Sequence, residues 1–243
     1  MFGLGRLKFF LRQTNLRRVH RTHRLENLED YSDVDKVVER YRKVGGLIND
    51  FQSYKLFSLV QLLRDLRPQN ILELGSGTTT AVFADWVRSN EGVRLYSLDE
   101  SDEWIRKSST LAGISEDDER FRMMSAPKIV EQLEDDRHVA SYDKSLTDKY
   151  DFVLIDGPSL NVDGRKRKDT VNTDIFKLVE VSAPQSIIVD IRVATVSAMI
   201  EKLHDYNYFI SDLIGNPNPE GLVSDKAFGL KSGYRYFSYF QKK

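Results

Sequence analysis

A short loop with an acid and two glycines carries the residues best suited to chemistry. It lies in the segment ILELGSGTTTA, where Glu73 is followed by Gly75 and Gly77. Glycine lets the backbone turn tightly and approach a ligand closely, and a helix that begins after such a loop offers free N–H groups. A dinucleotide-binding loop would have its third glycine at the position of Thr80, so the sequence weakens that interpretation.

A second acid, Asp99, ends the next apolar segment, LYSLD, and lies about 20 residues after Gly77. At this spacing an acid accepts hydrogen bonds from the ribose hydroxyls of an adenosine-containing cofactor. Glu73 and Asp99, with glycines between them, favour a cationic or hydroxylated ligand over an anionic one.

Two more acids end later apolar segments. Asp156 follows YDFVLI and precedes Gly157 and Pro158, and Asp190 follows SIIV. A positioned carboxylate can remove the proton of a hydroxyl group, so Asp156 is the first candidate for a general base and Asp190 the second. The structural alternative is that each carboxylate caps the following turn or pairs with Arg192.

Alternating helices and strands are expected to bring these acids to one place. We expect helices at 51–66, 79–88, 103–111, 171–181 and 193–206, a further helix opened by Pro127, and strands at 70–74, 93–98, 121–124, 150–155, 186–191, 208–214 and 234–240. This alternation predicts an α/β fold with a mostly parallel sheet, helices on both faces and an antiparallel pair of closing strands. Ligands of such sheets bind beyond the carboxyl ends of the strands, where the acids lie.

The composition fits a globular protein and excludes several classes. Of 243 residues, 40% are hydrophobic and 30% are charged, which is unlike a disordered chain. No apolar stretch reaches the length of about 18 residues that a membrane-spanning helix needs. There is no cysteine, which excludes disulfides and thiol chemistry and suits a reducing compartment, so we expect a cytoplasmic protein.

The first 24 residues form a basic segment with seven lysine or arginine residues and no acid. Phenylalanine and leucine between these charges fit a segment that lies on an anionic membrane surface, which would make the protein peripheral at a membrane, or one that binds an acidic partner. The alternative is a helix that packs its apolar face on the domain and leaves its arginines in water; an acid-free, arginine-rich start also resembles a transit peptide. We expect residues 1–49 to form this basic arm and its lead-in helices, and residues 50–243 to form the catalytic domain.

These motifs resemble, over residues 50–243, the class I S-adenosylmethionine-dependent methyltransferases. Their first motif, an acid, any residue and Gly-x-Gly after the first strand, matches Glu73, Gly75 and Gly77. The resemblance implies a Rossmann-like sheet of seven strands and S-adenosylmethionine as cofactor, with the first acid near its methionine amino group and Asp99 on its ribose. It also implies further cofactor contacts from Ser76, Thr78 and Thr79 in the loop, from Ser125 and Ala126 beside the adenine, and from Asp156, which faces the methyl acceptor.

A weaker resemblance concerns the acceptor. Short motifs similar to those of methyltransferases that O-methylate glucuronic acid residues of plant xylan are Asp156-Gly157-Pro158, Gly164-Arg165 and Asp190-Ile191-Arg192. This implies O-methylation of a hydroxyl on a sugar, a glycan or another small acidic acceptor, with Arg165 and Arg192 as substrate-binding residues. Arg192 lies one residue nearer to its acid than in that family, which leaves its role open. The run 165–168 forms either a positive rim beside the site or a solvated loop.

Other ligands and functions are less well supported. Catechol-type O-methyltransferases hold a divalent ion with an Asp-Asn pair after the fifth strand, whereas Asp190 is followed by Ile191, so we expect no required metal. The acidic remainder of the chain and the lack of an Asn-Pro-Pro-Tyr type of strand ending argue against nucleic acid as a partner. The alternatives are an NAD-dependent oxidoreductase and an inactive Rossmann-like binding or scaffold protein. The motifs do not indicate an oligomeric state.

Overall fold

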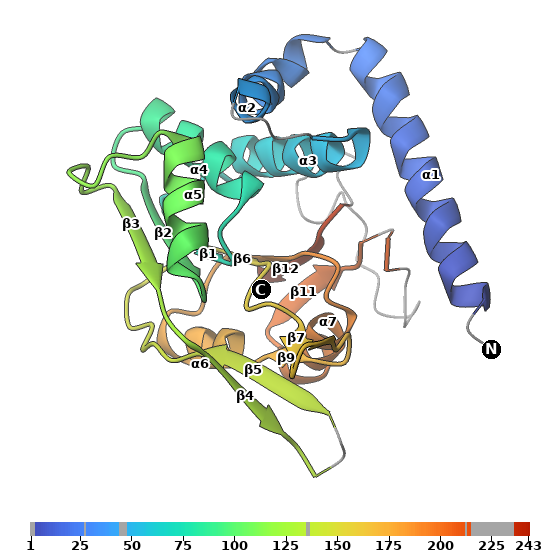
Figure 1. Cartoon of the computed structure of the whole chain (residues 1–243), viewed down its shortest axis with the longest axis vertical. Coiled ribbons are helices and arrows are strands. Elements are labelled where there is room, and N and C mark those ends of the chain that lie inside the picture. The colour runs from blue at the N-terminus through green and yellow to red at the C-terminus, as the bar shows by residue number, and fades with distance from the viewer. Residues whose placement is uncertain (1–2, 27, 44–47, 135–136, 212, 215–235) are drawn as a thin grey trace.

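A seven-stranded sheet forms the centre of the molecule. The computed structural model describes residues 3–26, 28–43, 48–134, 137–211, 213–214 and 236–243. The strands of this sheet are β1 (Asn70–Leu74), β2 (Arg94–Asp99), β3 (Phe121–Ser125), β6 (Phe152–Ile155), β10 (Ser186–Val189), β11 (Tyr206–Phe209) and β12 (Ser238–Lys242). Their order is β11-β12-β10-β6-β1-β2-β3, and β12 runs antiparallel to the other six strands (Figure 1). This confirms the expected Rossmann-like, mostly parallel sheet with a closing antiparallel pair.

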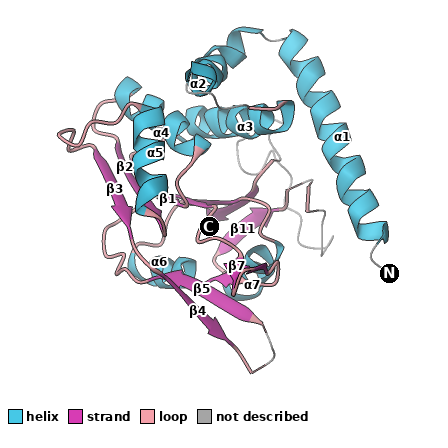
Figure 2. Ribbon diagram, viewed as in Figure 1, coloured by secondary structure: helices cyan, strands magenta, loops and turns pink. Residues whose placement is uncertain are grey.

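Helices cover both faces of the sheet, as expected. Successive residues of a strand point to opposite faces, so the apolar residues of each strand are buried by helices on both sides. On β1, Ile71 packs in a cluster with α3 (Asp50–Leu66) and α4 (Thr78–Ser89). Leu72 packs on the other face with α6 (Asp174–Val181) and α7 (Val193–Lys202). Figure 2 shows these layers, with α5 (Asp102–Ala112) next to β2 and β3.

The prediction of a helix that begins at Pro127 is wrong. The chain forms β4 (Lys128–Gln132), which pairs antiparallel with β5 (His138–Tyr142) in a hairpin that projects from the domain (Figure 1). Short β9 (Val171–Asn172), which was expected to begin a helix, extends this sheet parallel to β5. Two β-branched residues in β4 and a complete set of partners on β5 outweigh the helix-starting tendency of proline.

The N-terminal helices share the core of the domain. They are α1 (Gly3–Glu26), a 3₁₀ turn (Leu28–Tyr31) and α2 (Ser32–Lys43). Leu16 of α1 and Tyr31 are buried with Phe57 of α3, and the Tyr31 and Phe57 rings stack with centroids 4.1 Å apart. On its opposite side α1 exposes Leu7 and Phe10. None of the helices in the described ranges combines the length and apolarity that crossing a membrane requires. Residues 215–235, which include GNPNPEG between the last two expected strands, lie outside the described residues.

Candidate active site

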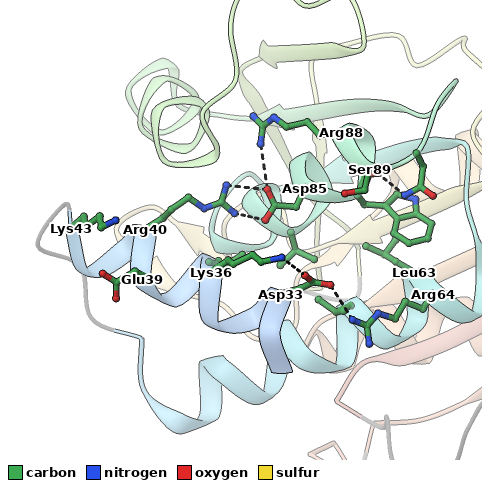
Figure 3. Close-up of a pocket in the computed structure, with 15 residues that line it drawn as sticks. Asp33, Lys36, Glu39, Arg40, Lys43, Leu63, Arg64, Asp85, Arg88 and Ser89 are labelled. Atoms are coloured by element: carbon green, nitrogen blue, oxygen red, sulfur yellow. Dashed lines mark hydrogen bonds and ion pairs between the residues drawn. The ribbon is translucent and has the colours of Figure 1, made fainter. Parts of the chain in front are cut away.

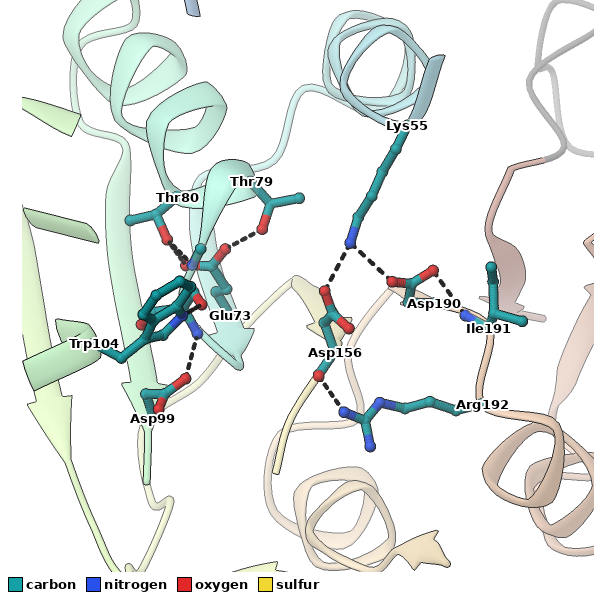
Figure 4. A network of polar contacts seen from close by, with 12 residues as sticks. Lys55, Glu73, Thr79, Thr80, Asp99, Trp104, Asp156, Asp190, Ile191 and Arg192 are labelled. Atoms are coloured by element: carbon teal, nitrogen blue, oxygen red, sulfur yellow. Dashed lines mark hydrogen bonds and ion pairs between the residues drawn. The ribbon is translucent and has the colours of Figure 1, made fainter. Parts of the chain in front are cut away.

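The loop after β1 is built around a buried carboxylate. The Glu73 side chain is 0% exposed and accepts hydrogen bonds from Thr79 Oγ1 (2.6 Å), Thr80 Oγ1 (2.7 Å) and Ser97 Oγ (2.6 Å) (Figure 4). Thr80 Oγ1 also accepts the Gly77 N–H at 2.9 Å. The threonine at the third-glycine position therefore fixes both the loop and its acid.

Burial dominates the electrostatics of Glu73. Desolvation raises the pKa of its carboxyl group to about 7, although the hydroxyls of Ser97, Thr79 and Thr80 favour the ionised form. The folded state therefore disfavours the ionised form of this carboxyl group. It lies beneath the loop and out of contact with solvent, so a ligand approaching from solvent meets the loop before it meets Glu73.

The second predicted acid orders the same loop from the neighbouring strand. Asp99 accepts the Ser76 N–H at Oδ2 and the Ser101 N–H at Oδ1, both at 3.0 Å, and burial raises the pKa of its carboxyl group. Trp104 of α5 donates its indole N–H to the Ser76 carbonyl, and the side chain remains 41% exposed. Its ring borders the loop at Gly77 (Figure 4).

The other predicted cofactor residues lie around this loop. Ser125 stands opposite Asp99 in the β2–β3 register and donates a hydrogen bond to Asp102. Ala126 is buried and donates its N–H to the Asp99 carbonyl at 3.0 Å. Thr78, half-buried, is the first residue of α4. The ends of β1, β2 and β3 thus bring these residues together as the strand pattern predicts.

Gly75 is required by packing between two loops. Its φ is +97°, and a Cβ at this position would lie 2.5 Å from the Gly157 nitrogen. A Cβ on Gly157 would in turn lie 2.1 Å from the Tyr142 hydroxyl. At Gly77, by contrast, a Cβ would meet only the Trp104 indole nitrogen, at 4.0 Å. Only the second glycine of the motif therefore borders open space, and the first brings the loop after β6 against the loop after β1.

A lysine that the sequence analysis did not identify joins the two candidate bases. α3 begins with a capping box between Asn49 and Gln52, and its second turn carries Lys55. The Lys55 Nζ lies 2.7 Å from Asp156 Oδ2 and 2.8 Å from Asp190 Oδ2 (Figure 4). The two acids follow paired residues of neighbouring strands β6 and β10. The structure thus brings both predicted acids to one ammonium.

The two carboxyl groups of this cluster differ in environment. Burial raises the pKa of Asp156 to about 6, with Asp190 adding to the rise and Lys55 and Arg192 opposing it. Burial acts in the same direction on Asp190, but the Lys55 ammonium outweighs it, so the pKa of Asp190 is lowered. Despite its own desolvation, the pKa of Lys55 lies well above its usual range because of the two acids. The side chain of Asp156 is 32% exposed and that of Asp190 is 15% exposed, so Asp156 is the more accessible.

The two predicted substrate-binding arginines occupy different environments. Arg192 is buried, and its Nη2 donates to the backbone carbonyl of Asp156, so it holds the strand end that carries the acid. Arg165 lies on the hairpin of β7 (Asn161–Val162) and β8 (Arg165–Lys166), where its side chain is exposed. Among the described contacts, Arg165 takes no part in the cluster around Lys55.

A cavity of the described residues lies away from this cluster. It measures about 770 Å³ and is lined by α2, α3 and α4, with an apolar floor that includes Val37 and Leu63. Among the residues that line it, Arg40 pairs with Asp85 at 3.0 Å (Figure 3). Except for Val82, the α4 residues that line it belong to the second half of that helix, away from the end that follows the glycine loop. This cavity is therefore separate from the candidate site.

Known proteins resemble this chain in structure, whereas no family model matches it and no curated protein matches its sequence. The O-methyltransferase TomG from Streptomyces achromogenes, involved in tomaymycin synthesis and solved in complex with SAM, is 16% identical over 87% of this chain and 90% of that chain, with a TM-score of 0.47. An O-methyltransferase from Bacillus cereus in complex with SAH is also 16% identical, over 87% and 91% of the two chains, with a TM-score of 0.46. SAH-bound methyltransferase PaMTH1 from Podospora anserina is 13% identical over 87% and 88%, with a TM-score of 0.48.

Proposed function

We propose that this protein is an S-adenosylmethionine-dependent methyltransferase that methylates a hydroxyl group of a sugar, a glycan or another small acidic acceptor. One observation carries the proposal: Glu73 and Asp99 end neighbouring parallel strands around a glycine loop, and Asp156 ends the strand on the other side. All three acids lie at the carboxyl edge of the sheet, where α/β folds bind their ligands.

The residues of this edge fit the cofactor. Asp99 Oδ2 accepts the Ser76 N–H and Oδ1 accepts the Ser101 N–H, both at 3.0 Å, and a carboxylate has further lone pairs with which to accept a ribose hydroxyl. Open space beside Gly77, next to the half-exposed Trp104 ring, leaves room for a ligand along the loop. When bound, S-adenosylmethionine would supply a methyl group on a positively charged sulfur. An oxygen nucleophile can attack the methyl carbon in line with the carbon–sulfur bond, and S-adenosylhomocysteine is the leaving group.

The Asp156 carboxylate suits the proton transfer that a hydroxyl acceptor requires. A general base acts best with a pKa near the working pH, and burial raises the pKa of Asp156 to about 6. Asp156 would accept the hydroxyl proton while the acceptor oxygen takes the methyl group. Lys55 stays protonated beside it and cannot serve as the base, because its pKa lies well above the usual range. The exposed basic hairpin of Arg165 and Lys166 favours an acidic acceptor.

A membrane surface is the second partner that we propose. One face of α1 packs on the domain through Leu16, while Leu7, Phe10 and Leu11 are exposed earlier in the same helix. No acid precedes Glu26 in this helix, which complements an anionic surface. Replacing the three exposed residues by serine should lower binding to phosphatidylserine vesicles by about tenfold or more, because apolar area no longer enters the interface. Serine at exposed Val181 and Val193 is the matched control, and equal binding by both variants would contradict the proposal.

The function is tested by calorimetric titration with S-adenosylmethionine, S-adenosylhomocysteine and NAD in parallel. We expect the first two to bind and NAD not to bind. Asp99→Ala should weaken cofactor binding by at least about tenfold, because a hydrogen bond to a charged group contributes roughly 1.5–3 kcal/mol. Binding of NAD alone, or of no ligand, would refute the proposal, and methyl transfer to acidic sugars and glycans then tests the acceptor.

A further inference from the structure

We propose that Lys55 is the built-in cation of the acceptor site: its ammonium occupies the place between the Asp156 and Asp190 carboxylates that a divalent ion takes between paired acids, and it thereby positions Asp156. The ammonium nitrogen lies 2.7 Å from one carboxylate and 2.8 Å from the other. The catalytic part of this inference rests on the proposed function, whereas the occupation of a cation site does not.

Three separate parts of the chain converge on this point. Lys55 comes from α3, which crosses the sheet edge, and the two acids leave neighbouring strands at the same level, since Ile155 pairs with Val189. The Lys55 side chain is only 11% exposed, and Figure 4 shows it reaching from the helix between the acids. Its nitrogen also lies 6.0 Å from the centroid of the Phe237 ring. A lysine so enclosed is held in one place rather than sampling solvent.

The charges around the cluster show why a cation is needed there. Two carboxylates at adjacent strand ends repel each other, and an unpaired buried charge is strongly destabilising. Lys55 compensates both, and Arg192 contributes a second cation through its contact with the Asp156 carbonyl. Glu73, Tyr41 and Tyr236 are further titratable groups that interact with the cluster. Without the ammonium, Asp156 and Asp190 would require another cation or a proton.

Loss of the lysine should therefore create a metal site. Divalent ions bind carboxylate oxygens at about 2.0–2.6 Å and complete their coordination with water. The first test measures Mn²⁺ binding by electron paramagnetic resonance. We expect Lys55→Ala to bind Mn²⁺ at least about tenfold more tightly than the wild type, whereas Lys55→Arg, which keeps the charge, should bind it as the wild type does. Equal Mn²⁺ affinity of Lys55→Ala and the wild type would overturn the inference.

A double variant assigns any new ion to this place. Adding Asp190→Asn to Lys55→Ala should abolish the gain in Mn²⁺ affinity, and an undiminished gain would place the ion elsewhere and refute the proposal. Mn²⁺ should also raise the melting temperature of Lys55→Ala and not that of the double variant. If Lys55→Ala proves too unstable to purify, Lys55→Gln keeps much of the side-chain volume without the charge, and the same expectations apply to it.

Methyl transfer provides the catalytic test. Lys55→Ala should lower turnover by about 100-fold while leaving S-adenosylmethionine affinity within about threefold, because the acid is no longer held in place. Lys55→Arg, or methylamine added to Lys55→Ala, should restore at least about tenfold, which loss of a purely structural contact would not allow. Failure to bind the cofactor would refute the proposed function and leave the Mn²⁺ result to decide on the cation site. If Lys55→Ala transfers methyl groups at the wild-type rate, only the role of Lys55 in positioning Asp156 is refuted.

Discussion

Replacing Glu73 by glutamine should remove a pH dependence from the stability of the protein. The native state raises the pKa of this carboxyl group from 4.5 to about 7, chiefly through burial. Because the folded state disfavours the ionised form, Glu73 lowers the free energy of unfolding as the pH rises from about 4.5 to above 7. Each pKa unit corresponds to about 1.4 kcal/mol, so the full effect amounts to about 3 kcal/mol. Glutamine cannot ionise and escapes this penalty.

The measurement is urea unfolding of both proteins between pH 5 and 8, followed by tryptophan fluorescence. The amide adds a constant offset, because it faces the same hydroxyls of Thr79 and Ser97 with a different set of donors. The difference between variant and wild type should nevertheless grow by about 2–3 kcal/mol in favour of the variant across this range. Glu131→Gln, at an exposed position of β4, is the control and should follow the wild type. Parallel curves for Glu73→Gln and the wild type would refute the argument that burial controls this carboxyl group.

Two further predictions concern the loops that meet at the sheet edge. Gly75→Ala should lower the free energy of unfolding by about 3 kcal/mol, because its Cβ would press on the Gly157 backbone. Gly164→Ala, at φ +73° with open space around it, should cost only about 1 kcal/mol in the same chemical unfolding assay. Equal losses would contradict the packing argument. Asp156→Asn should lower methyl transfer by about 10²- to 10⁴-fold and leave cofactor affinity within about threefold, and a larger loss for Asp190→Asn would identify the second acid as the base.

Sequence reasoning recovered the sheet because its strands are apolar, short and separated by helices of ordinary length. The acids at the strand ends followed from the same pattern, since parallel strands point their carboxyl ends to one edge. The β4 strand was missed because Pro127 is also a good first residue for a helix, and only the pairing with β5 decides between the two.

Lys55 was missed for a different reason. It lies 101 residues from Asp156 along the chain, so no local spacing links the two. A signal existed nonetheless: Lys55 stands among buried residues of α3, between Tyr54 and Leu56, where a charge needs a partner. The role of Thr80 was also missed. In the sequence this residue only argued against a dinucleotide-binding loop, whereas in the structure its hydroxyl donates a hydrogen bond to Glu73.

The position of β12 bears on how the molecule assembles. This strand follows both β10 and β11 in the sequence, yet it lies between them in the sheet, and β10 and β11 are not paired with each other. The sheet therefore cannot be completed in the order in which a ribosome delivers it, and β11 has no strand partner until residues 238–242 arrive. Phe237, Tyr239 and Phe240 fill the gap with fully buried rings. A nascent chain should thus keep an open sheet edge, a site for chaperones or misassembly, until residues 238–242 leave the exit tunnel.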